Sequence, residues 1–201
     1  MNASLVVSAH TPSGKLGSSI FNEITETGSV EVRVLGVTAT DIAIKGMTAA
    51  RKFLQPYHDD LVVIPRKIWG TTICSGISFF VVRMPTSMQG GIYNPTHSLL
   101  YGCTNTQIEK LAGAVAHRMR TIVYNPEPQV RYINLRAMGC MAITRSAQAL
   151  CKARNFLEKE PADLIFIPEF VELDIQGEGR TALNFIVVAM PGEIARIGIE
   201  S

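Results

Sequence analysis

The residues most able to do chemistry, the cysteines and histidines, are spread along the chain without ligand or catalytic spacing. No two cysteines stand in a C-x-x-C pattern, and no histidine pair follows them at zinc-finger spacing. No Ser/His/Asp or Cys/His arrangement is recognisable. The sequence therefore predicts a protein that is not an enzyme, with reduced cysteines and neither a metal nor a cofactor. The residues concerned are Cys74, Cys103, Cys140, Cys151, His10, His58, His97 and His117.

The charged residues also limit the classes of function. The 201-residue chain has 19 lysines and arginines against 17 aspartates and glutamates, which gives a net charge of +2. Dedicated nucleic-acid-binding domains are usually far more basic. Hydrophobic residues make up 47% of the chain and charged residues only 18%, which indicates a large core or a sizeable interface and argues against disorder.

The chain also has no feature typical of export. Its start lacks a basic region followed by an apolar run of signal length, and no 18-residue apolar stretch occurs in the sequence. We therefore expect a cytoplasmic protein without a membrane-spanning segment.

Two halves of the sequence match each other at an offset of 103 residues. The segment Ala50–Leu54 (ARKFL) aligns with Ala153–Leu157 (ARNFL), and Asp60–Pro65 (DLVVIP) aligns with Asp163–Pro168 (DLIFIP). An internal repeat of this kind indicates two copies of one structural unit. The stretch between them is rich in turn formers and matches neither copy. We therefore predict a first unit over residues 1–85, a linker over 86–97, a second unit over 98–191 and a C-terminal tail over 192–201.

Each copy shows the same order of elements. In the first copy, apolar patterning predicts a strand over 5–9, a helix ended by Gly28, a strand over 30–34, a helix ended by Pro56, and strands over 61–64 and 77–84. Thr38 or Thr40 is expected to cap the second helix, and Phe53 to point into the core. The prediction is an α+β two-layer fold, in which two tandem β-α-β-α-β-β units each pack two helices on one face of a four-stranded sheet.

Two repeated features of the second helix each allow two interpretations. Gly36 and Gly139 precede this helix, where backbone N–H groups hold an anion in some proteins, or where glycine simply makes a tight turn. Arg51 and Arg154 lie late in the helix, either as a phosphate or partner contact, or as a helix C-terminal cation that is stabilised by the macrodipole or forms an ion pair.

The order of elements and several motifs resemble the stage V sporulation protein S family. The closest stretch is 161–188, where Asp163–Pro168 and Asp174–Ala182 (DIQGEGRTA) are similar to that family's final hairpin. Val7–Ala9, followed by Pro12, resembles its start. The resemblance covers nearly all of both copies, whereas the bacterial members of this family are single units.

That family in turn resembles the Alba proteins, whose two-layer units dimerise and bind DNA or RNA. The resemblance implies two Alba-like units packed as an intramolecular pseudo-dimer. In Alba proteins the cations lie in a loop after the first strand and in an arm between the last two strands. The corresponding nucleic-acid-binding candidates are His10, Lys15, Arg66, Lys67 and Arg180.

Other residues are candidates for protein contacts. Small residues on the second helix, Gly46 and Ala49, correspond to Ala149 and Lys152 in the second copy. Small residues let another backbone approach closely, so we expect these positions to face the other unit or a partner protein. Trp69 lies near the tip of an apolar arm, where it is an interface anchor or a stacking platform for a base.

The sequence therefore leaves two functions open for a binding module. The first is a regulatory protein that associates with RNA or DNA, which follows from the Alba resemblance. The alternative is a structural or assembly protein that uses the duplicated fold for protein contacts in a larger complex, for example a cytoskeletal one. The low charge and the apolar arm favour the alternative.

Overall fold

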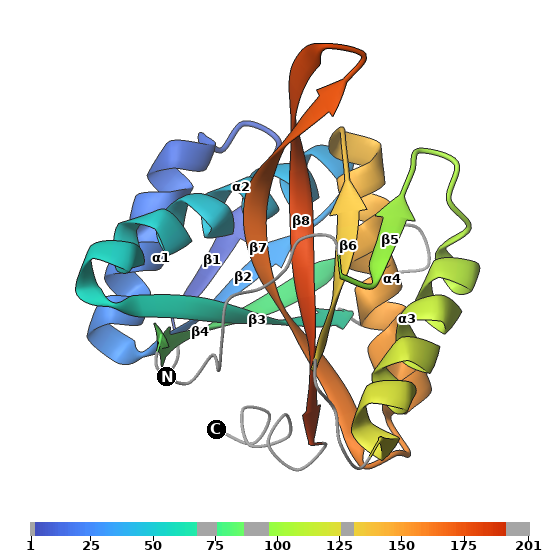
Figure 1. Cartoon of the computed structure of the whole chain (residues 1–201). Helices are drawn as coiled ribbons and strands as arrows, with labels where there is room; N and C mark the ends of the chain where they lie inside the picture. Colours follow the sequence, from blue (N-terminus) through green and yellow to red (C-terminus); the bar gives the residue numbers. More distant parts are fainter. Residues whose placement is uncertain (1–2, 68–75, 87–96, 126–130, 192–201) are drawn as a thin grey trace. The chain divides into compact units, whose positions relative to one another are not determined.

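The computed structural model describes residues 3–67, 76–86, 97–125 and 131–191, and the chain divides into two compact units, Met1–Tyr93 and Asn94–Ser201. Each unit repeats the order strand, helix, strand, helix, strand, strand (Figure 1). The predicted fold class, a duplicated α+β unit, is confirmed. The linker over 86–97 lies mostly outside the described residues, as does the tail over 192–201, and the pseudo-dimer stays a prediction.

Unit 1 forms a four-stranded sheet in the order β1-β2-β4-β3. Strands β1 and β2 are parallel, and the other neighbours are antiparallel. Its elements are β1 (Ser4–Val7), α1 (Ser13–Thr27), β2 (Ser29–Val34), α2 (Val37–Leu54), the short 3-10 helix η1 (Gln55–Tyr57), β3 (Asp59–Lys67) and β4 (Ile77–Pro85).

Unit 2 repeats this topology in the order β5-β6-β8-β7, again with one parallel pair, β5 and β6. Its elements are β5 (Leu99–Gly102), α3 (Ile108–Tyr124), β6 (Tyr132–Ala137), α4 (Cys140–Leu157), β7 (Ala162–Ile175) and β8 (Glu178–Pro191).

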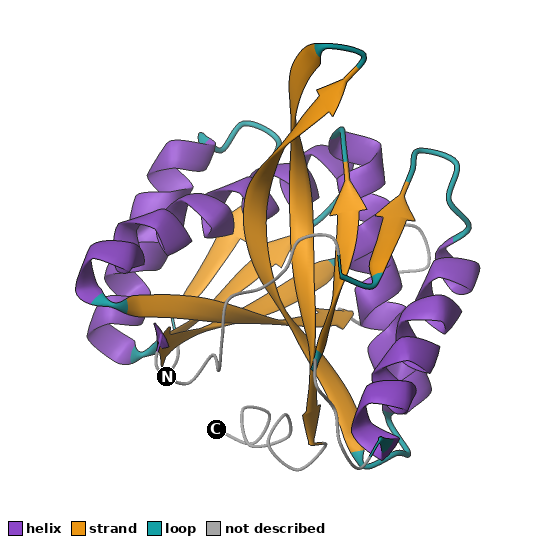
Figure 2. Ribbon diagram, in the orientation of Figure 1, coloured by secondary structure: helices purple, strands orange, loops and turns teal. Residues whose placement is uncertain are grey.

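In each unit the two helices cover one face of the sheet (Figure 2). In unit 1, Val30 and Val32 alternate with polar residues along β2 and pair in register with Val81 and Phe79 of β4. Because residues opposite each other on paired strands share a face, these four side chains form one apolar surface. All four are fully buried. We call the opposite face of each sheet, which carries Glu31 and Arg33 in unit 1, the open face.

The second helix of each unit begins at a glycine rather than at a threonine cap. Gly36 and Gly139 have φ angles of 89° and 87°, a region that side-chain-bearing residues rarely adopt. Thr40 lies inside α2 and its hydroxyl donates a hydrogen bond to the carbonyl of Gly36 over 2.8 Å. The predicted threonine cap is therefore wrong, because the strand-to-helix turn needs a backbone conformation that glycine supplies.

Phe53 is a second correction. It was predicted to point into the core, but its side chain is 43% exposed and its ring packs edge-on against Phe21 of α1, with ring centroids 6.0 Å apart. Tyr57 joins the same exposed aromatic cluster, 5.9 Å from Phe21. These rings cover the seam between α1 and α2 instead of the sheet.

The last two strands of unit 2 extend beyond the rest of their sheet. Strands β7 and β8 pair from Ala162↔Pro191 to Ile175↔Glu178, whereas β6 ends opposite Leu183. A two-residue turn joins them, with φ of 57° at Gln176 and 81° at Gly177, as expected for a tight hairpin. We call residues 170–183 the arm; it projects from the sheet with its tip at the top of Figure 1.

Candidate interaction surface

The two equivalent arginines of the second helices form ion pairs within their own units. Arg51 binds Asp60 through two hydrogen bonds, of 2.7 and 2.9 Å, and Arg154 binds Asp163 through two, of 2.7 and 2.5 Å. Each pair is largely buried, and each aspartate also accepts the backbone N–H of the residue that follows it. Of the two interpretations left open, the ion pair is the one found.

The small residues of α2 face the first helix of the same unit. A Cβ atom added at Gly46 would lie 2.7 Å from Cδ2 of Leu16, and one added at Gly17 would lie 2.8 Å from Cβ of Ala49. Helices α1 and α2 therefore pack with their backbones close together. The expectation that Gly46 and Ala49 face another unit or protein is wrong, because this face is already covered by α1.

The corresponding residues of unit 2 also lie inside that unit. Ala149 is fully buried, and the Lys152 amine pairs with the Glu109 carboxylate of α3 over 2.6 Å. That hydrogen bond lowers the pKa of Glu109. Lys152 thus bridges α4 to α3, at the position where Ala49 contacts α1 in unit 1.

The loop candidates after β1 lie close together in sequence but add little charge. His10 and Thr11 occupy an exposed turn in which the Thr11 hydroxyl accepts the backbone N–H of Ser8 over 3.0 Å. Lys15 follows in the first turn of α1. In unit 2 the same turn recurs, with the Thr106 hydroxyl accepting the N–H of Cys103 over 2.7 Å.

In unit 1 the candidates that correspond to the Alba arm lie at the end of β3 and beyond, and only the side chain of Arg66 is among the described residues. Its guanidinium lies 5.3 Å from the centre of the Phe80 ring, on the open face of the sheet, where it is half-buried. Lys67 is the last residue of β3, and its side chain lies outside the described residues, as does the whole of Trp69. The predictions made for those two side chains remain predictions.

The arm of unit 2 is acidic. Glu172, Asp174 and Glu178 are exposed on it, against the single cation Arg180. Arg180 pairs with Glu178 over 2.5 Å, and Glu172 accepts a hydrogen bond from the Thr181 hydroxyl over 2.7 Å. The arm therefore carries a net charge of −2 at the place where the Alba resemblance implies cations.

Several cations in the described residues form ion pairs with carboxylates of their own unit. They include Arg33, Lys45, Arg51, Arg83, Arg120, Lys152, Arg154 and Arg180. An arginine whose charge is already compensated adds little to the attraction of a polyanion.

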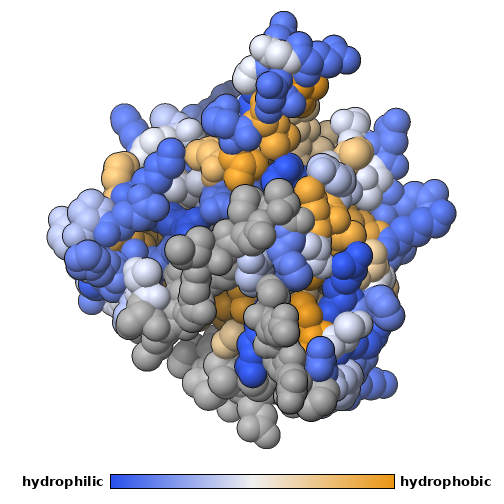
Figure 3. Space-filling model, in the orientation of Figure 1, coloured by the Kyte–Doolittle hydropathy of each residue, from blue (hydrophilic) through white to orange (hydrophobic). Residues whose placement is uncertain are grey.

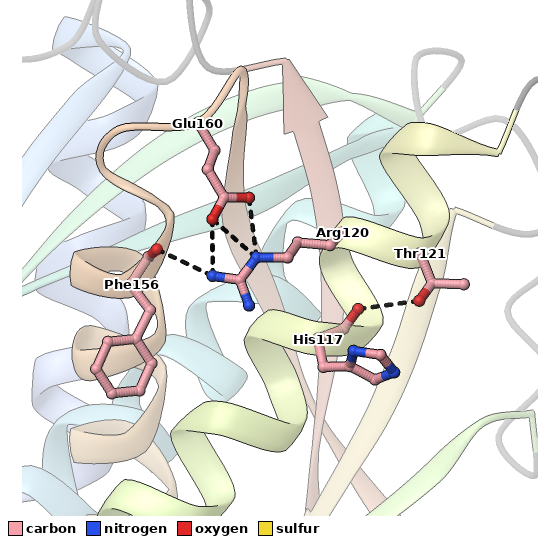
Figure 4. A network of polar contacts seen from close by, with 5 residues as sticks. All are labelled: His117, Arg120, Thr121, Phe156 and Glu160. Atoms are coloured by element: carbon pink, nitrogen blue, oxygen red, sulfur yellow. Dashed lines mark hydrogen bonds and ion pairs between the residues drawn. The ribbon is translucent and has the colours of Figure 1, made fainter.

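One of these pairs ties the end of α3 to the end of α4. The guanidinium of Arg120 contacts both carboxylate oxygens of Glu160 over 2.7–2.9 Å and donates to the Phe156 carbonyl over 3.2 Å (Figure 4). The hydrogen bond from Arg120 lowers the pKa of Glu160.

A matched polar pair on the open faces was missed by the sequence prediction. The Ser78 hydroxyl donates to Glu31 over 2.5 Å in unit 1, and the Asn184 amide donates to Asn134 over 2.8 Å in unit 2. Burial raises the pKa of Glu31, but hydrogen bonds from Arg33 and Ser78 outweigh it and hold that pKa below its usual value. Glu31 and Asn134 are related by the same 103-residue offset as the rest of the repeat, which is the signal that could have revealed them.

Exposed apolar side chains gather where β5 and β6 end, at the base of the arm. Tyr101 is 60% exposed and Met138 is 50% exposed. Further along the arm, Ile175 is 39% exposed. Figure 3 shows hydrophobic side chains toward the base of the arm and a hydrophilic tip. Large exposed apolar groups in one region mark an interaction surface more often than isolated ones do.

Two further features are absent from the described residues. Within them, no group of three or more histidine, cysteine, aspartate or glutamate side chains comes together as a metal site would require. No helix among them is long and apolar enough to cross a membrane.

The repeated topology and the repeated Arg–Asp pairs define a protein built from two copies of one two-layer α+β unit. The family model described as Stage V sporulation protein S matches residues 3–69 and 100–190, one segment in each unit. The chain therefore belongs to the stage V sporulation protein S family, and the resemblance drawn from the motifs is confirmed.

Proposed function

We propose that this chain is a non-enzymatic, sporulation-related regulatory protein that acts through contacts with other proteins. The family name supports a role connected with sporulation. The observation that carries the choice of protein contacts is the acidic arm, where three exposed carboxylates accompany one ion-paired arginine. Such a surface repels phosphate, and nucleic-acid binding depends on several cations on one surface.

The exposed apolar residues at the base of the arm support the same proposal. Strands β5 and β6 are paired neighbours. Tyr101 lies near the carboxyl end of β5, Met138 directly follows β6, and both side chains are exposed. Interfaces between proteins are enriched in aromatic residues and methionine. This combination of an apolar base and an acidic tip suits a protein partner better than a nucleic acid.

Affinity capture of the tagged full chain from sporulating cells tests the proposal. The lysate is divided, and one half is treated with DNase and RNase before capture. Proteins that act through direct contact remain bound after nuclease treatment, in a constant ratio to the tagged chain. If every captured protein is lost with the nucleic acid, the chain is a nucleic-acid-associated regulator and the proposal is wrong.

A further inference from the structure

We draw no further inference here: the strongest candidate, the exposed apolar pair of Tyr101 and Met138 at the ends of β5 and β6, which unit 1 repeats at the ends of β1 and β2, carries nothing because nothing in the structure shows what covers it.

Discussion

Arg154 holds Asp163 through two hydrogen bonds, and this contact repeats the one between Arg51 and Asp60 in the other unit. In each unit it links the last turn of the second helix to the first residues of the strand that follows. The loop between these elements is therefore fixed from both sides. Both copies retain the pair, and we expect the unit to depend on it.

Replacement of Arg154 by methionine tests this dependence. The change leaves Asp163 charged and largely buried without its cation, which is expected to cost about 3 kcal/mol. For a chain of this size that loss lowers the melting temperature by about 6–12 °C. Calorimetry measures it, and Arg180→Met, which removes an exposed pair, is expected to leave melting unchanged. Equal melting of the two variants would contradict a structural role for Arg154.

Two glycines of α1 offer a matched test of helix packing. A Cβ at Gly17 would meet Ala49 at 2.8 Å and the Gly46 carbonyl at 3.1 Å, whereas a Cβ at Gly14 has nothing within 4 Å. Gly17→Ala is expected to destabilise the protein by about 1–3 kcal/mol because the helices must move apart. Gly14→Ala is expected to be neutral or slightly stabilising, since alanine is the better helix former. Denaturant unfolding of both variants measures the difference, and an unaffected Gly17→Ala would show that the two helices are not in close contact.

The Arg120–Glu160 pair predicts a pH effect with a definite sign. The hydrogen bond from Arg120 lowers the pKa of Glu160 below the usual 4.5. A carboxylate with a depressed pKa in the folded state stabilises the fold above its unfolded pKa, and this contribution is lost as the pH falls through the folded pKa. NMR titration of the Glu160 carboxyl carbon is expected to give a midpoint below 4.5. In Arg120→Gln the midpoint should return toward 4.5, and a midpoint that is the same in both proteins would contradict the pairing.

The fold could be predicted from sequence because the repeat supplied each element twice. Asp60–Pro65 and Asp163–Pro168 align without a gap and are identical at four of six positions, and both form the start of an edge strand in their unit's sheet. The similarity of Asp174–Ala182 to the family's final hairpin likewise predicted the hairpin found there. Predictions were wrong where tertiary contacts determine the orientation of a side chain. Apolar spacing alone could not show that Phe53 stacks on Phe21 in place of the core.

The candidate site was harder to predict than the fold. Small residues at Gly46 and Ala49 indicate a close backbone approach, but the sequence does not say which backbone approaches, and in the structure it is α1. The polar pair of Asn134 with Asn184 depends on register across two strands separated by about fifty residues, as the hydrogen bond between them records. The low net charge of +2 already supported the assembly-protein alternative, although the Alba resemblance placed nucleic-acid association first.

The most direct test of the central claim is the affinity of the purified chain for nucleic acid. Fluorescence anisotropy with labelled duplex DNA and single-stranded RNA is measured at two salt concentrations, on the wild type and on a variant with Arg66 and Lys67 changed to glutamate. We expect no saturable binding at micromolar protein, and any residual binding should show a shallow salt slope of about −2 to −4 in log K against log salt. Saturable submicromolar binding with a steeper slope, lost in the double variant, would contradict a function based on protein contacts.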